Sequence, residues 1–211
     1  MVLRFDDFAG DFPPIGSVVL RSDDFASDLP LIGSVVLQPN DFGSDLPPIG
    51  SGVLQSNGLG SDFVRLFNPS VDANCSPYET EYTGAHVFMR VQQLADVAGF
   101  YRAFGLRVAA DFHERPDHIA AELEFMQVLA LKEARALARS ERGNAGVCRR
   151  AQARFLKEHL GRWLAPYAQR LSTLNDGFYA RLASLAASFV AWDARRLRVE
   201  PEIAAASPVA A

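Results

Sequence analysis

The sequence lacks several features that would narrow its function. Only two cysteines occur in 211 residues, Cys75 and Cys148, and they form neither a CxxC pair nor a metal-ligand spacing. We therefore expect both thiols to be free, as is usual in a reducing compartment. No apolar run approaches the roughly 20 residues of a membrane-spanning helix, and the first residues lack the basic-then-apolar layout of a secretory signal. These absences predict a cytoplasmic protein without a membrane span.

Signatures of catalysis and cofactor binding are also missing. The chain has no nucleophile motif, no Gly-rich phosphate loop and no cofactor fingerprint, so we expect no cofactor. Its net charge of −4 is unevenly spread, since residues 1–74 carry a net −7 and residues 75–211 a net +3. The second part is only mildly basic, and its aromatic residues are not interleaved with the basic ones. This pattern argues against nucleic acid as a partner.

A tandem repeat with a period of 17 residues fills the first part of the chain. The units align from Arg4, Arg21, Gln38 and Gln55. Each has a short apolar run between Gly, Pro and Asp residues, a pattern of extended chain rather than of helix. The repeat is either an arm that binds a partner or a low-complexity extension without a packed core. The composition favours the second interpretation.

The rest of the chain has the 3.6-residue periodicity of amphipathic helices. The expected helices are 85–104, 116–140, 147–163, 166–174 and 178–196. Gly105 is well placed to end the first of them in the left-handed conformation, and Gly143 and Gly146 are expected to end the second. The sum is an all-α fold, an antiparallel helical bundle. The expected division of the chain is a repeat extension at 1–61, a helical domain at 62–199 and a disordered tail at 200–211.

The stretch from Glu114 to Met126 organises the helical part. Pro116 suits the first position of a helix, which would put Asp117 and His118 beside unpaired N–H groups and the positive end of the helix dipole. An apolar stripe follows at helical spacing, and we expect it to be the buried face: Ile119, Leu123, Met126, Ala130, Ala134 and Leu137. The Asp-His corner either caps its own helix or meets an anionic or peptide-like partner.

A small hydrolase is the alternative hypothesis for the same region. His118 and Glu122 are four residues apart and share a helix face, and His113 lies just upstream. Together they could bind a metal, and Asp117 with His118 could serve as an acid–base pair. Two convergent residues do not complete a metal site, which needs three or four ligands. We therefore expect no metal.

The motifs, taken in order, resemble one known family. The run Pro116-Asp117-His118, followed by Glu122-Leu123-Glu124-Phe125-Met126, is similar to the signature of the TorD/DmsD/NarJ family of redox-enzyme maturation chaperones. Further pieces occur in family order: Leu66-Phe67, Pro77-Tyr78-Glu79, Tyr101 to Leu106, Phe155 to Leu160 with Trp163, and Phe178-Tyr179. The form of the motifs is most similar to chaperones serving dimethylsulfide, ethylbenzene, selenate and chlorate or perchlorate enzymes.

The resemblance implies a TorD-like, non-catalytic chaperone, monomeric or homodimeric. Its implied partner is the apo catalytic subunit of a molybdoenzyme or the twin-arginine signal peptide of that subunit, held until cofactor insertion. The implied client-binding residues, because they match family residues that line the ligand-binding region, are Glu114, Pro116, Asp117, His118 and Glu122. The family ordinarily has several helices where the repeat stands, so these are missing or replaced here.

Overall fold

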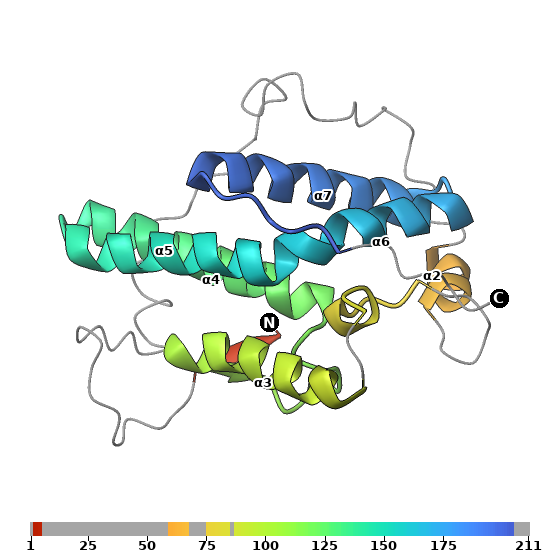
Figure 1. Ribbon diagram of the computed structural model, residues 1–211, viewed down its shortest axis with the longest axis horizontal. Helices are drawn as coiled ribbons and strands as arrows, with labels where there is room; N and C mark the ends of the chain where they lie inside the picture. Colours follow the sequence, from red (N-terminus) through yellow and green to blue (C-terminus); the bar gives the residue numbers. More distant parts are fainter. Residues whose placement is uncertain (1, 6–58, 68–74, 85–86, 205–211) are drawn as a thin grey trace.

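Helices make up most of the residues that the computed structural model describes, which are 2–5, 59–67, 75–84 and 87–204 (Figure 1). In chain order the elements are β1 Leu3–Phe5, α2 Leu59–Phe67, the 3-10 helix η2 Glu79–Glu81, α3 Val87–Ala103, β2 Leu106–Val108, α4 Ile119–Ala138, α5 Arg142–Glu158, α6 Leu160–Leu174 and α7 Phe178–Leu197. The expected all-α helical bundle is confirmed. No helix within the described ranges is both long and apolar enough to cross a membrane.

Two helix pairs form the body of the bundle. α4 packs against α5, α6 packs against α7, and α3 lies along one side (Figure 1). Aromatic side chains fill the space where these helices meet. Phe125 and Phe155, both fully buried, have ring centroids 4.8 Å apart, and Trp163 stacks on Tyr82. Rings of this size contribute much of the apolar area that a domain buries.

Glycine marks one helix boundary and not another. Gly105 has φ +71° and follows α3, as expected of a left-handed helix end. Gly143 and Gly146 lie inside α5, so the expected break there is wrong. The turn is made at Ser140 instead, which takes a left-handed φ of 61°. A glycine inside a helix costs about 1 kcal/mol, which the packing of α5 on α4 can offset.

The helix boundary expected at Pro166 is absent from the structure. Pro166 was expected to start a new helix, but α6 begins at Leu160 and contains it. Proline has no N–H, so the carbonyl four residues earlier, that of Arg162, loses its helical partner. The backbone N–H of Ala204 donates to this carbonyl at 2.8 Å. The tail therefore lies against α6 as far as Ala204, and residues 205–211 lie outside the described part.

A short strand near the N-terminus packs on the bundle. β1 pairs antiparallel with β2, with Leu3 opposite Val108, and Leu3 is fully buried. The Glu124 carboxylate accepts hydrogen bonds from the N–H groups of Val2 (2.6 Å) and Leu3 (2.8 Å). No strand was expected here. Residues 6–58, which hold most of the repeat, lie outside the described residues.

The buried face of α4 differs from the expected stripe. Of that stripe Met126 is buried, Ile119 and Leu123 are half-buried, and the others are exposed, Leu137 to 56%. The side chains that α4 buries are Ala121, Glu122, Phe125, Met126, Val128, Leu129, Glu133 and Ala136. α4 is thus apolar on two faces. Periodicity alone cannot say which face the bundle covers, and the contact with α5 decides it.

Candidate functional site

Two sequence motifs that are almost forty residues apart lie side by side. Tyr78 and His118 form an isolated antiparallel bridge. The N–H of Glu79 donates to the carbonyl of Asp117 at 3.0 Å, and the N–H of Ile119 donates to the carbonyl of Pro77 at 2.9 Å. The Pro-Tyr-Glu segment is therefore held against the Asp-His corner by backbone hydrogen bonds.

Asp117 is the fully buried centre of this junction. Its Oδ2 accepts hydrogen bonds from the Thr80 N–H at 3.1 Å and from the Thr80 hydroxyl at 2.9 Å. The Arg115 guanidinium donates through Nε to Oδ1 at 3.0 Å and through Nη2 to Oδ2 at 3.1 Å. Both oxygens of the carboxylate thus accept hydrogen bonds from Thr80 or Arg115. Asp117 ties the two motifs together and does not cap α4.

His118 is the residue that caps α4. Its Nδ1 accepts a hydrogen bond from the Ala120 N–H at 3.1 Å, and the helix begins at Ile119 rather than at Pro116. The half-buried imidazole meets Tyr78 and Phe112 edge-on, with ring centroids 5.3 and 5.4 Å away. Burial lowers the pKa of His118 from its ordinary 6.5 and outweighs the nearby carboxylates, which raise it. A neutral ring suits a nitrogen that accepts a hydrogen bond.

The exposed rim of the corner joins charged and aromatic groups. The Tyr78 hydroxyl donates to the Glu114 carboxylate, and the Arg115 guanidinium lies 4.1 Å from the Tyr78 ring centroid, within cation–π range. Burial and then the Glu114 hydrogen bond raise the pKa of Tyr78 to about 12. The rim therefore brings together the Glu114 carboxylate, the Arg115 guanidinium and the neutral Tyr78 phenol.

Glu122 points into the interior, away from this rim. It is fully buried, and its Oε2 accepts a hydrogen bond from Trp163 Nε1 at 3.0 Å. Its Oε1 has no hydrogen-bond partner among the described residues. Burial, followed by the charge of Glu79, raises the pKa of Glu122 well above the ordinary 4.5. Glu122 thus connects α4 to α6 through Trp163.

The structure brings together part of the site expected from the sequence. Glu114, Asp117 and His118 meet around Tyr78 and Arg115. Neither of these two residues stands out in the sequence beyond its place in the motifs. The backbone carbonyl of Pro116 accepts a hydrogen bond from the Tyr101 hydroxyl at 2.8 Å, so the turn itself is fixed from α3.

The residues of the hydrolase hypothesis do not converge. His113 is exposed in the loop before α4, His118 Nδ1 caps the helix, and Glu122 faces Trp163. Within the described ranges these three do not form a group of ligand atoms that could share a metal ion.

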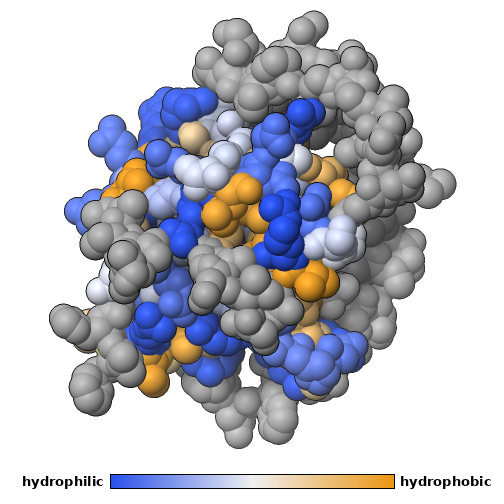
Figure 2. Space-filling view, turned by 90° about the vertical axis from the view of Figure 1, so that its right-hand side faces the viewer, coloured by the Kyte–Doolittle hydropathy of each residue, from blue (hydrophilic) through white to orange (hydrophobic). Residues whose placement is uncertain are grey.

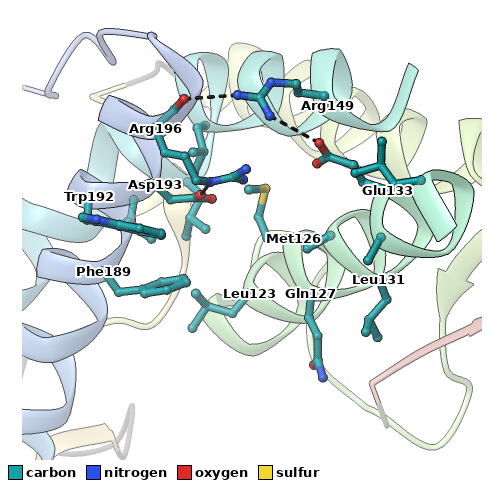
Figure 3. Close-up of a pocket in the computed structure, with 16 residues that line it drawn as sticks. Leu123, Met126, Gln127, Leu131, Glu133, Arg149, Phe189, Trp192, Asp193 and Arg196 are labelled. Carbon is teal, nitrogen blue, oxygen red and sulfur yellow. Dashed lines mark hydrogen bonds and ion pairs between the residues drawn. The ribbon is translucent and has the colours of Figure 1, made fainter. Parts of the chain in front are cut away.

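A pocket of ≈ 640 Å³ opens between α4, α5 and α7 (Figure 3). Its walls include Leu123, Met126, Ala130, Ala134 and Leu137 of α4, and Phe189, Val190 and Trp192 of α7. These α4 residues belong to the stripe that the sequence singled out as the core. At one end of the pocket Arg149 pairs with Glu133 at 3.4 Å, and Arg196 pairs with Asp193 at 2.6 Å.

Smaller apolar surfaces occur elsewhere. Phe63 and Val64 of α2 are each more than half exposed. The face of the molecule in Figure 2 carries separate apolar patches among hydrophilic side chains. Scattered exposed apolar residues are normal on a protein surface. The pocket differs from them, because its apolar side chains line one concave site.

Comparison with known proteins settles the family. Residues 49–169, more than half of the chain, match the family described as Nitrate reductase delta subunit. The chain belongs to this family. The resemblance to the TorD/NarJ chaperones that the motifs indicated is thereby confirmed.

Curated proteins similar to this family member are named as assembly chaperones of reductases. It is 37% identical over 132 residues to the perchlorate reductase assembly chaperone protein of Dechloromonas aromatica, covering 61% of this chain and 58% of that protein. It is 39% identical over 88 residues to the selenate reductase assembly chaperone protein of Thauera selenatis, covering 42% and 44%. It is 28% identical over 133 residues to the chaperone protein TorD of Photobacterium profundum, covering 63% and 60%. The chain thus spans three fifths or less of the length of these relatives.

Proposed function

We propose that this member of the nitrate reductase delta subunit family is a non-enzymatic chaperone for a molybdopterin oxidoreductase. It would bind the apo catalytic subunit, or the twin-arginine leader of that subunit, in the cytoplasm before cofactor insertion and export. The relatives' names support the chaperone role. The observation that carries the proposal is the apolar pocket between α4 and α7, which leaves the second apolar face of α4 uncovered.

The shape of the pocket suits an amphipathic peptide. Leu123 and Leu137 are fourteen residues apart on α4, which corresponds to about 21 Å along a helix. A helical segment of about the same length could lie along this face, as amphipathic helices do in the grooves of other peptide-binding proteins. The apolar segment of a leader peptide has this character, and its burial against Phe189 and Trp192 would supply the affinity.

The corner would add the charged contact. Ile119 starts the stripe one helical turn before Leu123, so the rim of the corner adjoins the pocket along α4. The exposed Glu114 carboxylate could accept a charge-assisted hydrogen bond from a leader arginine. Asp117 and Glu122 are buried and in this proposal do not contact the client. They hold neighbouring side chains in position, Asp117 that of Arg115 and Glu122 that of Trp163. Pro116 and His118 complete the rim.

Titration calorimetry with a twin-arginine leader of a molybdopterin oxidoreductase from the same organism tests the proposal. Leu137→Gln (56% exposed) and Phe189→Ser (41% exposed) remove apolar area from the pocket. Each should weaken binding roughly tenfold, since burial of a half-exposed large side chain contributes about 1–2 kcal/mol.

Two matched controls accompany these variants. Met89→Gln on α3 (55% exposed) and Leu182→Ser on α7 (49% exposed) change similar side chains that do not line the pocket, and both should bind as the wild type does. Equal affinity of all four variants would refute the pocket as the client site. Loss of binding in Glu114→Gln alone would place the client at the corner instead.

A further inference from the structure

Three side chains form a cluster that the proposed function does not use. Asp96 comes from α3, and Glu158 and His159 lie at the junction of α5 and α6. Each brings one ligand atom to a point where all three atoms lie within 4.8 Å of one another. The Asp96 and Glu158 side chains are 53% and 38% exposed, whereas that of His159 is 4% exposed. The cluster is therefore open to solvent on its carboxylate side and closed on its imidazole side.

The two ring nitrogens of His159 have different surroundings. Nδ1 lies 3.2 and 3.1 Å from the two carboxylate oxygens of the buried Glu79. Nε2 is buried and has no hydrogen-bond partner within the described part of the chain, although Asp96 Oδ2 lies 3.4 Å away. If Nδ1 carries the proton and donates it to Glu79, the lone pair of Nε2 faces a carboxylate. Two electron-rich atoms so placed attract a cation between them.

We infer that Asp96, Glu158 and His159 bind a divalent transition-metal ion of the zinc type. Zinc lies about 2.0–2.2 Å from imidazole nitrogen and carboxylate oxygen, and two ligands of a tetrahedral ion are then about 3.4 Å apart. The distance between His159 Nε2 and Asp96 Oδ2 is 3.4 Å. An imidazole ligand among carboxylates favours zinc, nickel or cobalt over magnesium or calcium.

Glu79 supplies the support that such a site requires. A histidine that binds a metal usually donates its other N–H to a carboxylate, which fixes the tautomer and the ring orientation. Glu79 stands in this position, and it is itself buried. Sequence patterns do not reveal this arrangement, because Asp96, Glu79 and His159 come from three separate segments with no metal-ligand spacing.

Arg154 competes with the ion in the structure as it stands. Its Nε donates to both oxygens of Glu158, at 3.0 and 2.9 Å, and its side chain is largely exposed. An incoming ion would displace the guanidinium from Glu158. It would then tie α3 to the α5–α6 junction and stabilise the folded state, because binding to the native state alone raises stability. This inference is independent of the proposed chaperone function.

The test uses the tag-free full chain, titrated with Zn²⁺ by calorimetry and with Co²⁺ by visible absorption. We expect one ion per chain, the intense absorption of tetrahedral Co²⁺ and a higher melting temperature with Zn²⁺. Asp96→Asn should weaken binding at least tenfold. Arg154→Ala should tighten binding, because it removes the competing cation. Asp111→Asn changes an exposed carboxylate outside the cluster and should bind as the wild type does.

Three results would overturn the site. The first is no stoichiometric uptake of either ion. The second is uptake that Asp96→Asn does not change. The third is weaker binding in Arg154→Ala. The surface variants carry the test because His159→Gln can unfold the protein, and circular dichroism of each variant checks that the helices are intact.

Discussion

Replacement of Asp117 by Asn should destabilise the protein, because this side chain joins two distant segments. The carboxylate is fully buried and accepts two hydrogen bonds from Thr80 and two from Arg115. An Asn side chain has one oxygen and one NH₂ group. Either orientation turns the NH₂ toward an N–H donor, of Thr80 or of Arg115, and the charge that pairs with the guanidinium is lost.

The size of the effect follows from these contacts. Removal of one partner of a fully buried ion pair costs about 3–5 kcal/mol. Arg115 is 37% exposed, so water can solvate part of its guanidinium, and we lower the expectation to about 2–3 kcal/mol. For a protein of this length that corresponds to a fall in melting temperature of roughly 5–10 °C.

Thermal and urea unfolding, followed by circular dichroism, measure this loss. Asp111→Asn is the matched control, because Asp111 also pairs with an arginine, Arg4 at 2.7 Å, but both side chains are more than half exposed. An exposed pair contributes at most about 1 kcal/mol. If Asp117→Asn and Asp111→Asn have the same melting temperature, Asp117 does not hold the Pro-Tyr-Glu segment against the Asp-His corner. Weaker leader binding at unchanged stability would show instead that Asp117 contacts the client directly.

Two further predictions concern α4. Because burial raises the pKa of Glu122, the folded protein keeps a proton that the unfolded chain releases above about pH 4.5, so wild-type stability falls as the pH rises toward the folded-state pKa. Glu122→Gln keeps an acceptor for Trp163 but cannot ionise, so its stability relative to wild type should increase as the pH rises above about 4.5. Urea melts over a pH series measure this difference, and a difference that stays constant with pH would contradict the prediction. Leu129→Ala, on the core face, should lower the free energy of unfolding by about 2–5 kcal/mol, and Leu123→Ala, at the half-buried pocket wall, by less than half of that. Equal losses would mean that the pocket wall is part of the core.

Local chemistry in the sequence was enough for the helical class and several boundaries. The expected helix at 178–196 corresponds to α7, Phe178–Leu197, and the one at 85–104 to α3, Val87–Ala103. Gly105 ends α3 as its conformational freedom predicts. These features depend on residues that are close together in the chain. The same is true of each short motif that indicated the family. The helix expected at 147–163, in contrast, was placed too far along the chain. α5 ends at Glu158, because the backbone breaks at the single residue His159, and Trp163 belongs to α6.

Contacts between distant segments determine which side chains are buried and which hydrogen bonds form, and sequence patterns alone could not predict either. The periodicity of α4 revealed an apolar stripe, but only the packing of α5 shows that this stripe lines a pocket while Phe125 and Leu129 face the core. The buried Glu122 accepts a hydrogen bond from Trp163, 41 residues later, a partner that only the folded chain brings within reach. Pro166 stays within a helix because Ala204 takes over the vacant hydrogen bond of Arg162. A sequence specifies the polarity and backbone preference of each residue, whereas burial and hydrogen-bond satisfaction depend on partners that only the folded chain brings within reach.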